Sequence, residues 1–191
     1  MSKIAIFISG EGSNASKMLR NFSERDGLGV SLVYSSRPNE NLKALCADFG
    51  VVFQYSPWND SQKTNLLQLC KKMSIDWVVL AGFLKLVPKS FIAHFPNKII
   101  NIHPALLPKF GGKGMYGMHV HKAVIHAKEL ESGITIHYVN GAYDEGQIIK
   151  QFKVSISENE SSQTLSAKVR ALEHKHFSDT VAELINPVKN Q

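Results

Sequence analysis

The sequence predicts an α/β protein with a mostly parallel sheet flanked by helices, late strands that extend the sheet, and a long C-terminal helix. Apolar runs of strand length alternate with helical patterns over about the first 100 residues, which is typical of a doubly wound sheet. A glycine-containing turn follows the first apolar run, where such sheets often bind a ligand. The alternation stops after residue 103, and two further strands and one long helix are expected there.

The first part of the chain is expected to supply five strands, at residues 3–8, 29–35, 51–55, 76–81 and 98–103. The helices between them are expected at residues 15–25, 41–49, 61–73 and 88–94. Gly50 ends the second helix as a C′ residue. The run DWVVLA at 76–81 is largely apolar, which favours a central strand. Cys46 and Cys70 fall in helices and are expected to be buried apolar side chains.

The second part begins with FGGKGMYGM at 110–118, which is expected to be a mobile loop. A helix is expected at 119–128, strands at 133–139 and 147–154, and the long helix at 163–185. The connection at 140–146 is too long for a tight hairpin, so a functional loop is expected.

Length and composition restrict the class of protein. The chain of 191 residues suggests one domain, and 43% hydrophobic residues are enough for a core. No apolar run reaches the roughly 18 residues of a membrane span, and the N-terminus is too short for a signal peptide, so a cytoplasmic protein is expected. The net charge of +6 comes from scattered basic residues, which suits small anionic substrates better than nucleic acid.

Asn101 and His103 form the most informative pair. Side chains alternate along a strand, so these two point to the same side and Ile102 to the other. Pro104 ends the strand, which places the pair at the sheet edge where open α/β sheets bind ligands. Asparagine donates to an oxygen, and histidine donates or takes a proton near neutral pH. Taken alone, the pair is more typical of a structural histidine beside a capping asparagine.

The turn after the first strand carries Gly10, Gly12, Ser13 and Asn14. Glycines allow a close backbone approach, and the following helix begins with free amides, so a phosphate site is expected. A tight turn with a helix cap explains the same residues. The letters also match G-x-G-x-x-A, a weak dinucleotide fingerprint, with Arg37 available for a 2′-phosphate.

Two further segments are ambiguous on their own. Residues 82–87 offer apolar side chains and backbone groups that suit a flat heterocycle, but core packing explains them too. Asp144 is a turn residue or a carboxylate beside His103. In the second case it is expected to raise the pKa of His103 and to have its own pKa lowered. His119 and His121 do not have recognised metal-ligand spacing, so no metal is expected.

Taken together, these segments resemble the folate-dependent formyl transferases over nearly the whole chain. The matching stretches are ISGEGSN at 8–14, VVLAGFLKLV at 78–87, NIHPALLPKF at 101–110, ITIHYVN at 134–140, YDEG at 143–146 and VRALEH at 169–174. Within the family, SGxGSN resembles the members that formylate a phosphorylated ribosyl glycinamide. The resemblance implies a Rossmann-like, phosphate-binding half at about 1–100 and a catalytic and folate-loop half at about 101–191.

The resemblance also implies an activity. A formyl group would pass from 10-formyltetrahydrofolate to the amine of N1-(5-phospho-D-ribosyl)glycinamide, in purine biosynthesis. Transfer would be direct, with neither a metal nor a covalent enzyme intermediate. The partners would be these two small molecules, with no nucleic acid or membrane, and the protein would be a monomer or homodimer.

Roles for individual residues follow from the same resemblance. The catalytic residues would be Asn101, His103 and Asp144. The phosphate would bind at Gly12, Ser13 and Asn14, and the ribose and glycinamide end at Arg170 and Glu173. The folate would contact Leu84, Lys85, Leu86, Val87, Asn101, Asn140, Gly141, Ala142, Tyr143 and Asp144.

Three departures from the family pattern are present. Gln147 follows Gly146 where a proline is common, which leaves the course of the loop open. Residues 111–117 add glycines that form either a lid or a loose insertion, and no arginine at 59–63 matches the family's folate contact. An NADP-linked reductase and a non-catalytic nucleotide-binding module remain as alternatives. A formyl transferase acting on initiator tRNA would need an additional RNA-binding domain.

Overall fold

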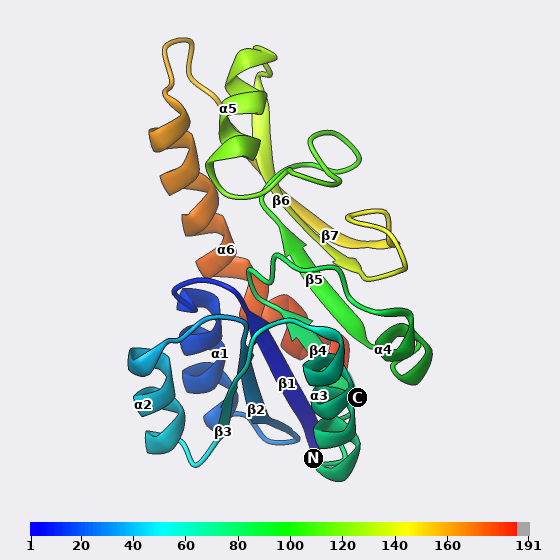
Figure 1. The fold of residues 1–191 in the computed structure, drawn as a ribbon. Helices are drawn as coiled ribbons and strands as arrows, with labels where there is room; N and C mark the ends of the chain where they lie inside the picture. The colour runs from blue at the N-terminus through cyan, green and yellow to red at the C-terminus, as the bar shows by residue number, and fades with distance from the viewer. Residues whose placement is uncertain (187–191) are drawn as a thin grey trace.

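The computed structural model describes residues 1–186 and contains a seven-stranded sheet with helices on both faces (Figure 1). The strands are β1 (Ser2–Ile8), β2 (Leu28–Ser35), β3 (Val52–Tyr55), β4 (Trp77–Leu80), β5 (Ile99–His103), β6 (Glu131–Tyr138) and β7 (Ile148–Ser155). The helices are α1 (Ser13–Ser23), α2 (Glu40–Asp48), α3 (Asp60–Lys72), α4 (Lys89–His94), α5 (Met118–His126) and α6 (Ser162–Ile185).

The order of strands across the sheet is β3-β2-β1-β4-β5-β6-β7. The first five are parallel, whereas β6 is antiparallel to β5 and β7 is antiparallel to β6. This confirms the predicted α/β fold, with late strands that extend a parallel sheet. The described helices include none that is long and apolar enough to cross a membrane.

Alternation along β1 divides the core between the two faces of the sheet. Ile4, Ile6 and Ile8 join a cluster with apolar side chains of α1, α2, α5 and α6. Ala5 and Phe7 join the opposite cluster, which contains side chains of α3 and α4. Both faces of the central strands are therefore buried, as the continuous apolar runs predicted.

Helix ends explain most of the predicted boundaries. The side chains of Asn39 and Asn59 cap α2 and α3, and Ser161 forms a capping box at the start of α6. Gly50 follows α2 with a φ of 65°, as expected of a C′ residue. Helix α1 begins at Ser13, two residues earlier than predicted, because Gly12 takes the N-cap position.

The register of the sheet exposes the end of β5. Leu80, the last residue of β4, pairs with Asn101, so β5 continues two residues past its parallel neighbour. His103 at the tip pairs instead with Thr135 of β6. Asn101 and His103 thus lie at the carboxyl edge of the parallel strands, where open sheets bind ligands.

Candidate active site

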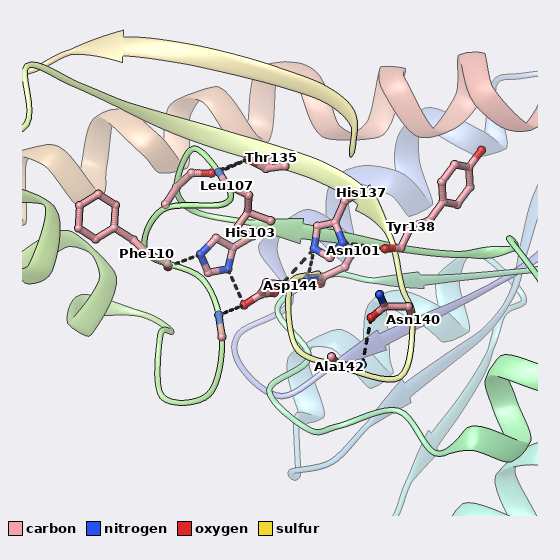
Figure 2. Close-up of polar contacts among 12 residues, drawn as sticks. Asn101, His103, Leu107, Phe110, Thr135, His137, Tyr138, Asn140, Ala142 and Asp144 are labelled. Atoms are coloured by element: carbon pink, nitrogen blue, oxygen red, sulfur yellow. Dashed lines mark hydrogen bonds and ion pairs between the residues drawn. The ribbon is translucent and has the colours of Figure 1, made fainter. Parts of the chain in front are cut away.

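A cavity of about 650 Å³ lies at this edge of the sheet. Most of the predicted site residues line it, namely Gly12, Ser13, Asn14, Leu84, Lys85, Leu86, Val87, Asn101, His103, Ala142, Tyr143, Asp144, Arg170 and Glu173. Asn140 and Gly141 are not among the lining residues. Instead, the side chain of Asn140 accepts a hydrogen bond from the backbone N–H of Ala142, which shapes the loop (Figure 2).

Asp144 contacts both residues at the tip of β5 (Figure 2). Its Oδ2 lies 3.4 Å from Nδ1 of His103, and its Oδ1 accepts a 3.4 Å hydrogen bond from Nδ2 of Asn101. The backbone N–H of Gly112 donates to Oδ2 at 2.9 Å. The side chains of His103 and Asp144 are only 4% and 10% exposed, so little water screens their interaction. The loop after β6 therefore brings the predicted trio together.

His137 is a buried neighbour of this trio that the sequence analysis did not assign. Its Nδ1 lies 2.8 Å from the carbonyl oxygen of Tyr138, which accepts only, so Nδ1 carries a proton. Its Nε2 lies 3.0 Å from Nδ2 of Asn101 and accepts from that amide when the ring is neutral. His137 therefore orients the Asn101 side chain. The sequence does contain a signal for this position. Thr135 and His137 are two residues apart on β6, so the alternation of a strand places both side chains on the same side of the sheet.

Burial reverses one electrostatic expectation. Burial lowers the pKa of His103 below its ordinary value, although Asp144 and the carbonyl of Phe110 act in the opposite direction. The expectation of a raised pKa is wrong. Burial removes hydration from the charged imidazolium, and this cost exceeds the stabilisation that the Asp144 carboxylate provides. Burial raises the pKa of Asp144, but His137, His103 and the Gly112 N–H together outweigh it. The pKa of Asp144 therefore lies below its usual value, as expected.

The segment after β5 lies against the predicted trio. The carbonyl of Phe110 lies 2.8 Å from Nε2 of His103 (Figure 2). Residues of the glycine-rich segment 112–117 line the cavity. This segment is therefore a wall of the site and not an insertion away from it.

The predicted phosphate turn lies at the start of α1. Gly12 has a φ of 77°, in the left-handed region that favours glycine, and the first amides of the helix are available to a ligand. Ser13 Oγ lies 3.0 Å from Nε2 of His174 on α6. The Asn14 side chain donates a hydrogen bond to Glu173 on α6 at 2.8 Å and lines the cavity. Its amide group therefore links the two helices, and its part in binding a phosphate stays a prediction.

Glu173 is held between the two helices. Burial raises its pKa, while the Asn14 amide and the charge of Arg170 act in the opposite direction. Arg170 lies one turn earlier on α6 and also lines the cavity. The pair adds a carboxyl group and a guanidinium to the cavity that the predicted phosphate turn and the predicted trio also line.

The segment after β4 alternates between core and cavity. Phe83 and Val87 are buried, and Phe83 packs edge-on against Trp58 and Phe7. Leu84 and Leu86 remain 40% and 44% exposed and line the cavity. Core packing therefore explains only part of this segment. The rest forms an apolar wall that suits a flat ring.

Comparison with known proteins identifies the family. A family model described as formyl transferase matches residues 2–181. The chain belongs to the formyl transferase family.

Several relatives of this chain carry the name phosphoribosylglycinamide formyltransferase. A chloroplastic protein of that name from Arabidopsis thaliana is 38% identical over 189 residues, covering 95% of this chain. The chain spans 65% of the length of that plant protein. The Bacillus subtilis protein of that name is 28% identical, over 97% of this chain and 95% of its own. A crystal structure of the Bacillus halodurans protein matches with a TM-score of 0.87 and 30% identity, covering 99% and 98% of the two chains.

The turn that follows β5 is anchored by the antiparallel strands β6 and β7. Thr135 Oγ1 donates to the carbonyl of Ala105 at 2.6 Å and accepts from the N–H of Leu107 at 3.0 Å. Gln151 on β7 donates to Thr135 and to the carbonyl of Leu107. The anchor fixes the course of the chain between His103 and the glycine-rich segment.

Gln147 takes part in the pairing at the end of the loop through its backbone. Its backbone carbonyl accepts from the N–H of Tyr138 at 2.9 Å. A proline at the same position would offer the same carbonyl.

Two alternative kinds of site find little support. Arg37, which the reductase interpretation requires, is not among the cavity-lining residues. Within residues 1–186, no three His, Cys, Asp or Glu side chains group as metal ligands would.

Proposed function

We propose that this chain transfers a formyl group from 10-formyltetrahydrofolate to the amine of glycinamide ribonucleotide. One observation carries the proposal: a single cavity is lined both by the Gly12–Asn14 turn and by the trio of Asn101, His103 and Asp144. The wall made by Leu84 and Leu86 suits the pterin ring. Membership of the formyl transferase family and the names of the relatives support the same activity.

The reaction begins with attack of the neutral amine on the formyl carbon. A carbon–nitrogen bond forms, the formyl oxygen becomes an oxyanion, and the amine nitrogen loses a proton. The bond to N10 of the folate then breaks and N10 takes a proton. Donors placed where the negative charge develops lower the barrier, and a positioned acid or base moves the proton.

The observed contacts refine the roles of Asn101 and His103. The N–H groups of both side chains already face acceptors within the protein. The formyl oxygen must therefore share one of these N–H groups with its present acceptor or displace that acceptor. The contacts of Asp144 with Asn101 and with His103, both 3.4 Å, are the longest of these and are the easiest to replace. Asp144 opposes the effect of burial on His103 and thereby favours the charged ring that stabilises an oxyanion.

The direct test combines purified protein, glycinamide ribonucleotide and 10-formyltetrahydrofolate. Formation of tetrahydrofolate is followed by absorbance, and formylated product by mass spectrometry. Release of the folate product only in the presence of both substrates is the expected result. Oxidation of NADPH without formyl transfer would favour the reductase alternative, and binding without any turnover would favour the nucleotide-binding module.

Gly12→Val tests the phosphate site. A side chain at Gly12 would meet Leu42 and Ile8 and would strain a backbone with φ of 77°. We expect KM for glycinamide ribonucleotide to rise by about 10- to 100-fold, as when one hydrogen bond to a charged group is lost. KM for the folate should change much less. Gly50→Val is the matched control, because its φ of 65° carries a similar strain far from the cavity. Equal effects on both substrates would contradict the assignment.

Hydrogen exchange tests the folate site. A folate analogue should slow exchange of the backbone amides at 84–87 and 142–144, where the chain lines the cavity. Asn140 and Gly141 lie outside the lining and should show smaller changes. Protection at Ser35–Arg37 instead would support a dinucleotide and contradict the folate proposal.

Other expectations from the sequence remain predictions. These are the absence of a metal requirement, the monomeric or homodimeric state and the cytoplasmic location.

A further inference from the structure

His121 is a buried side chain of the cavity wall that the proposed mechanism does not use. It lies in the first turn of α5, is 4% exposed, and lines the cavity. Its Nδ1 is buried without a hydrogen-bond partner among the described residues. Buried polar atoms are nearly always paired in native proteins, so an unpaired one beside a ligand cavity requires an explanation, and a role of the ring in ligand binding is one.

The surroundings of the ring determine where its proton lies. A proton on Nδ1 would be a buried donor without an acceptor, at a cost of about 1–3 kcal/mol. The neutral ring therefore carries its proton on Nε2, the nitrogen that remains available to a ligand. Burial and the charges of Arg170 and His103 lower the pKa of His121, so the ring stays neutral. His121 thus offers one N–H donor and no charge.

The neighbours of His121 are residues proposed for different parts of the amine substrate. Asn14 and Glu173 are hydrogen-bonded to each other at the phosphate turn. Arg170 lies one turn before Glu173 on α6, which packs against α5, and its charge acts on the His121 ring. His103 lines the same cavity, and its charge acts on the same ring. His121 is therefore a neighbour both of a residue proposed for the ribose and glycinamide end and of a residue proposed for the chemistry.

We propose that Nε2–H of His121 binds the carbonyl oxygen of the glycinamide arm. This rests on the proposed function and adds a contact to it. In glycinamide ribonucleotide the amide lies between the ribose and the reacting amine, and His121 lines the cavity together with the residues proposed for both. A carbonyl oxygen accepts only, whereas ribose hydroxyls also donate and suit the carboxyl group of Glu173. Fixing the amide would aim the amine at the formyl carbon.

Two amide substitutions separate the nitrogen atoms of the ring. The side-chain nitrogen of His121→Gln reaches the place of Nε2, whereas that of His121→Asn reaches only the place of Nδ1. We expect His121→Gln to keep a KM for glycinamide ribonucleotide close to that of wild type. His121→Asn should raise this KM by about tenfold, the effect of one lost hydrogen bond. KM for the folate should stay the same in both, and melting temperatures check that both variants are folded.

Formyl transfer by the wild-type protein is measured first, because its absence would refute the proposed function and not this contact alone. With an active wild type, equal losses in both variants would show that the ring acts by packing and would overturn the contact. Unchanged KM in both variants would overturn it as well. Nitrogen-15 spectra of the wild type test it without any variant. We expect a neutral ring protonated at Nε2, and a shift of that signal on addition of glycinamide ribonucleotide; a proton on Nδ1 would contradict the proposal.

Discussion

Asp144→Asn is expected to lower kcat by about 10²- to 10⁴-fold, the usual contribution of a positioned acid or base. The substitution keeps the size of the side chain and removes its charge. It also suits the backbone, because Asp144 has a φ of 58° and asparagine tolerates this left-handed region. Both KM values should change far less, since the carboxylate acts on His103 and on proton transfer. Steady-state kinetics with both substrates measure the effect.

Glu145→Gln is the matched control, because it removes a charge from the adjacent exposed residue of the same loop. It should leave kcat near that of wild type. A folded Asp144→Asn protein with wild-type kcat would reject the mechanism even though the family assignment would stand.

The pH profile of the same variant gives a second readout. The negative charge of Asp144 raises the pKa of His103 against the effect of burial, so its removal lowers that pKa further. If the charged ring is required, the fall of kcat at high pH moves to lower pH in Asp144→Asn. His103→Asn should cost a similar factor, and the double variant less than the product of the two factors, because the pair acts as a unit. A high-pH limb that does not move would show that Asp144 does not act through His103.

Gly146→Ala is expected to lower kcat by about 10²-fold or more, since a displacement of roughly 1 Å at a catalytic group has an effect of this size. A Cβ at Gly146 would lie 1.6 Å from the carbonyl oxygen of Tyr138, which is backbone and cannot turn aside. The loop must therefore move away from β6, and Asp144 two residues earlier moves with it. Kinetics and the melting temperature measure the loss of activity and of stability.

Gly141→Ala is the control from the same loop, because a Cβ there meets nothing within 4 Å. It should keep kcat and stability. Wild-type activity in Gly146→Ala would mean that the position of Asp144 tolerates a shift of its loop.

The fold was predictable because its determinants are local. An apolar run such as 76–81 indicates a strand, and the glycine after α2 indicates the end of a helix. Pro104 indicates the end of β5. Each of these signals depends on neighbouring residues alone. The antiparallel pairing of β6 with β5 could not be predicted, because the register of two strands depends on contacts between segments that are distant in the sequence. The early start of α1 follows from Gly12, whose left-handed backbone places the N-cap before Ser13.

The candidate site was predictable only in part. The alternation of Asn101 and His103 placed both on one side, and the resemblance supplied Asp144. The sign of the pKa shift of His103 could not be obtained from the sequence, because it depends on how much hydration the ring loses. The hydrogen bond from Asn14 to Glu173 joins residues 159 positions apart, and only the packing of α1 on α6 reveals it.

The cavity draws its walls from both parts of the chain, and this has a thermodynamic consequence. The proposed phosphate site joins the turn at Gly12 to α6, and the proposed folate site joins the segment at Leu84 to the loop at Asp144. A bound ligand therefore ties the early strands to the late ones. Its binding free energy adds to the unfolding free energy of the whole sheet, by about 2.7 kcal/mol at a ligand concentration of a hundred times Kd. Each bound substrate thus stabilises the contact between the two parts of the chain. We expect the two parts to unfold together, at a higher melting temperature than without the substrate.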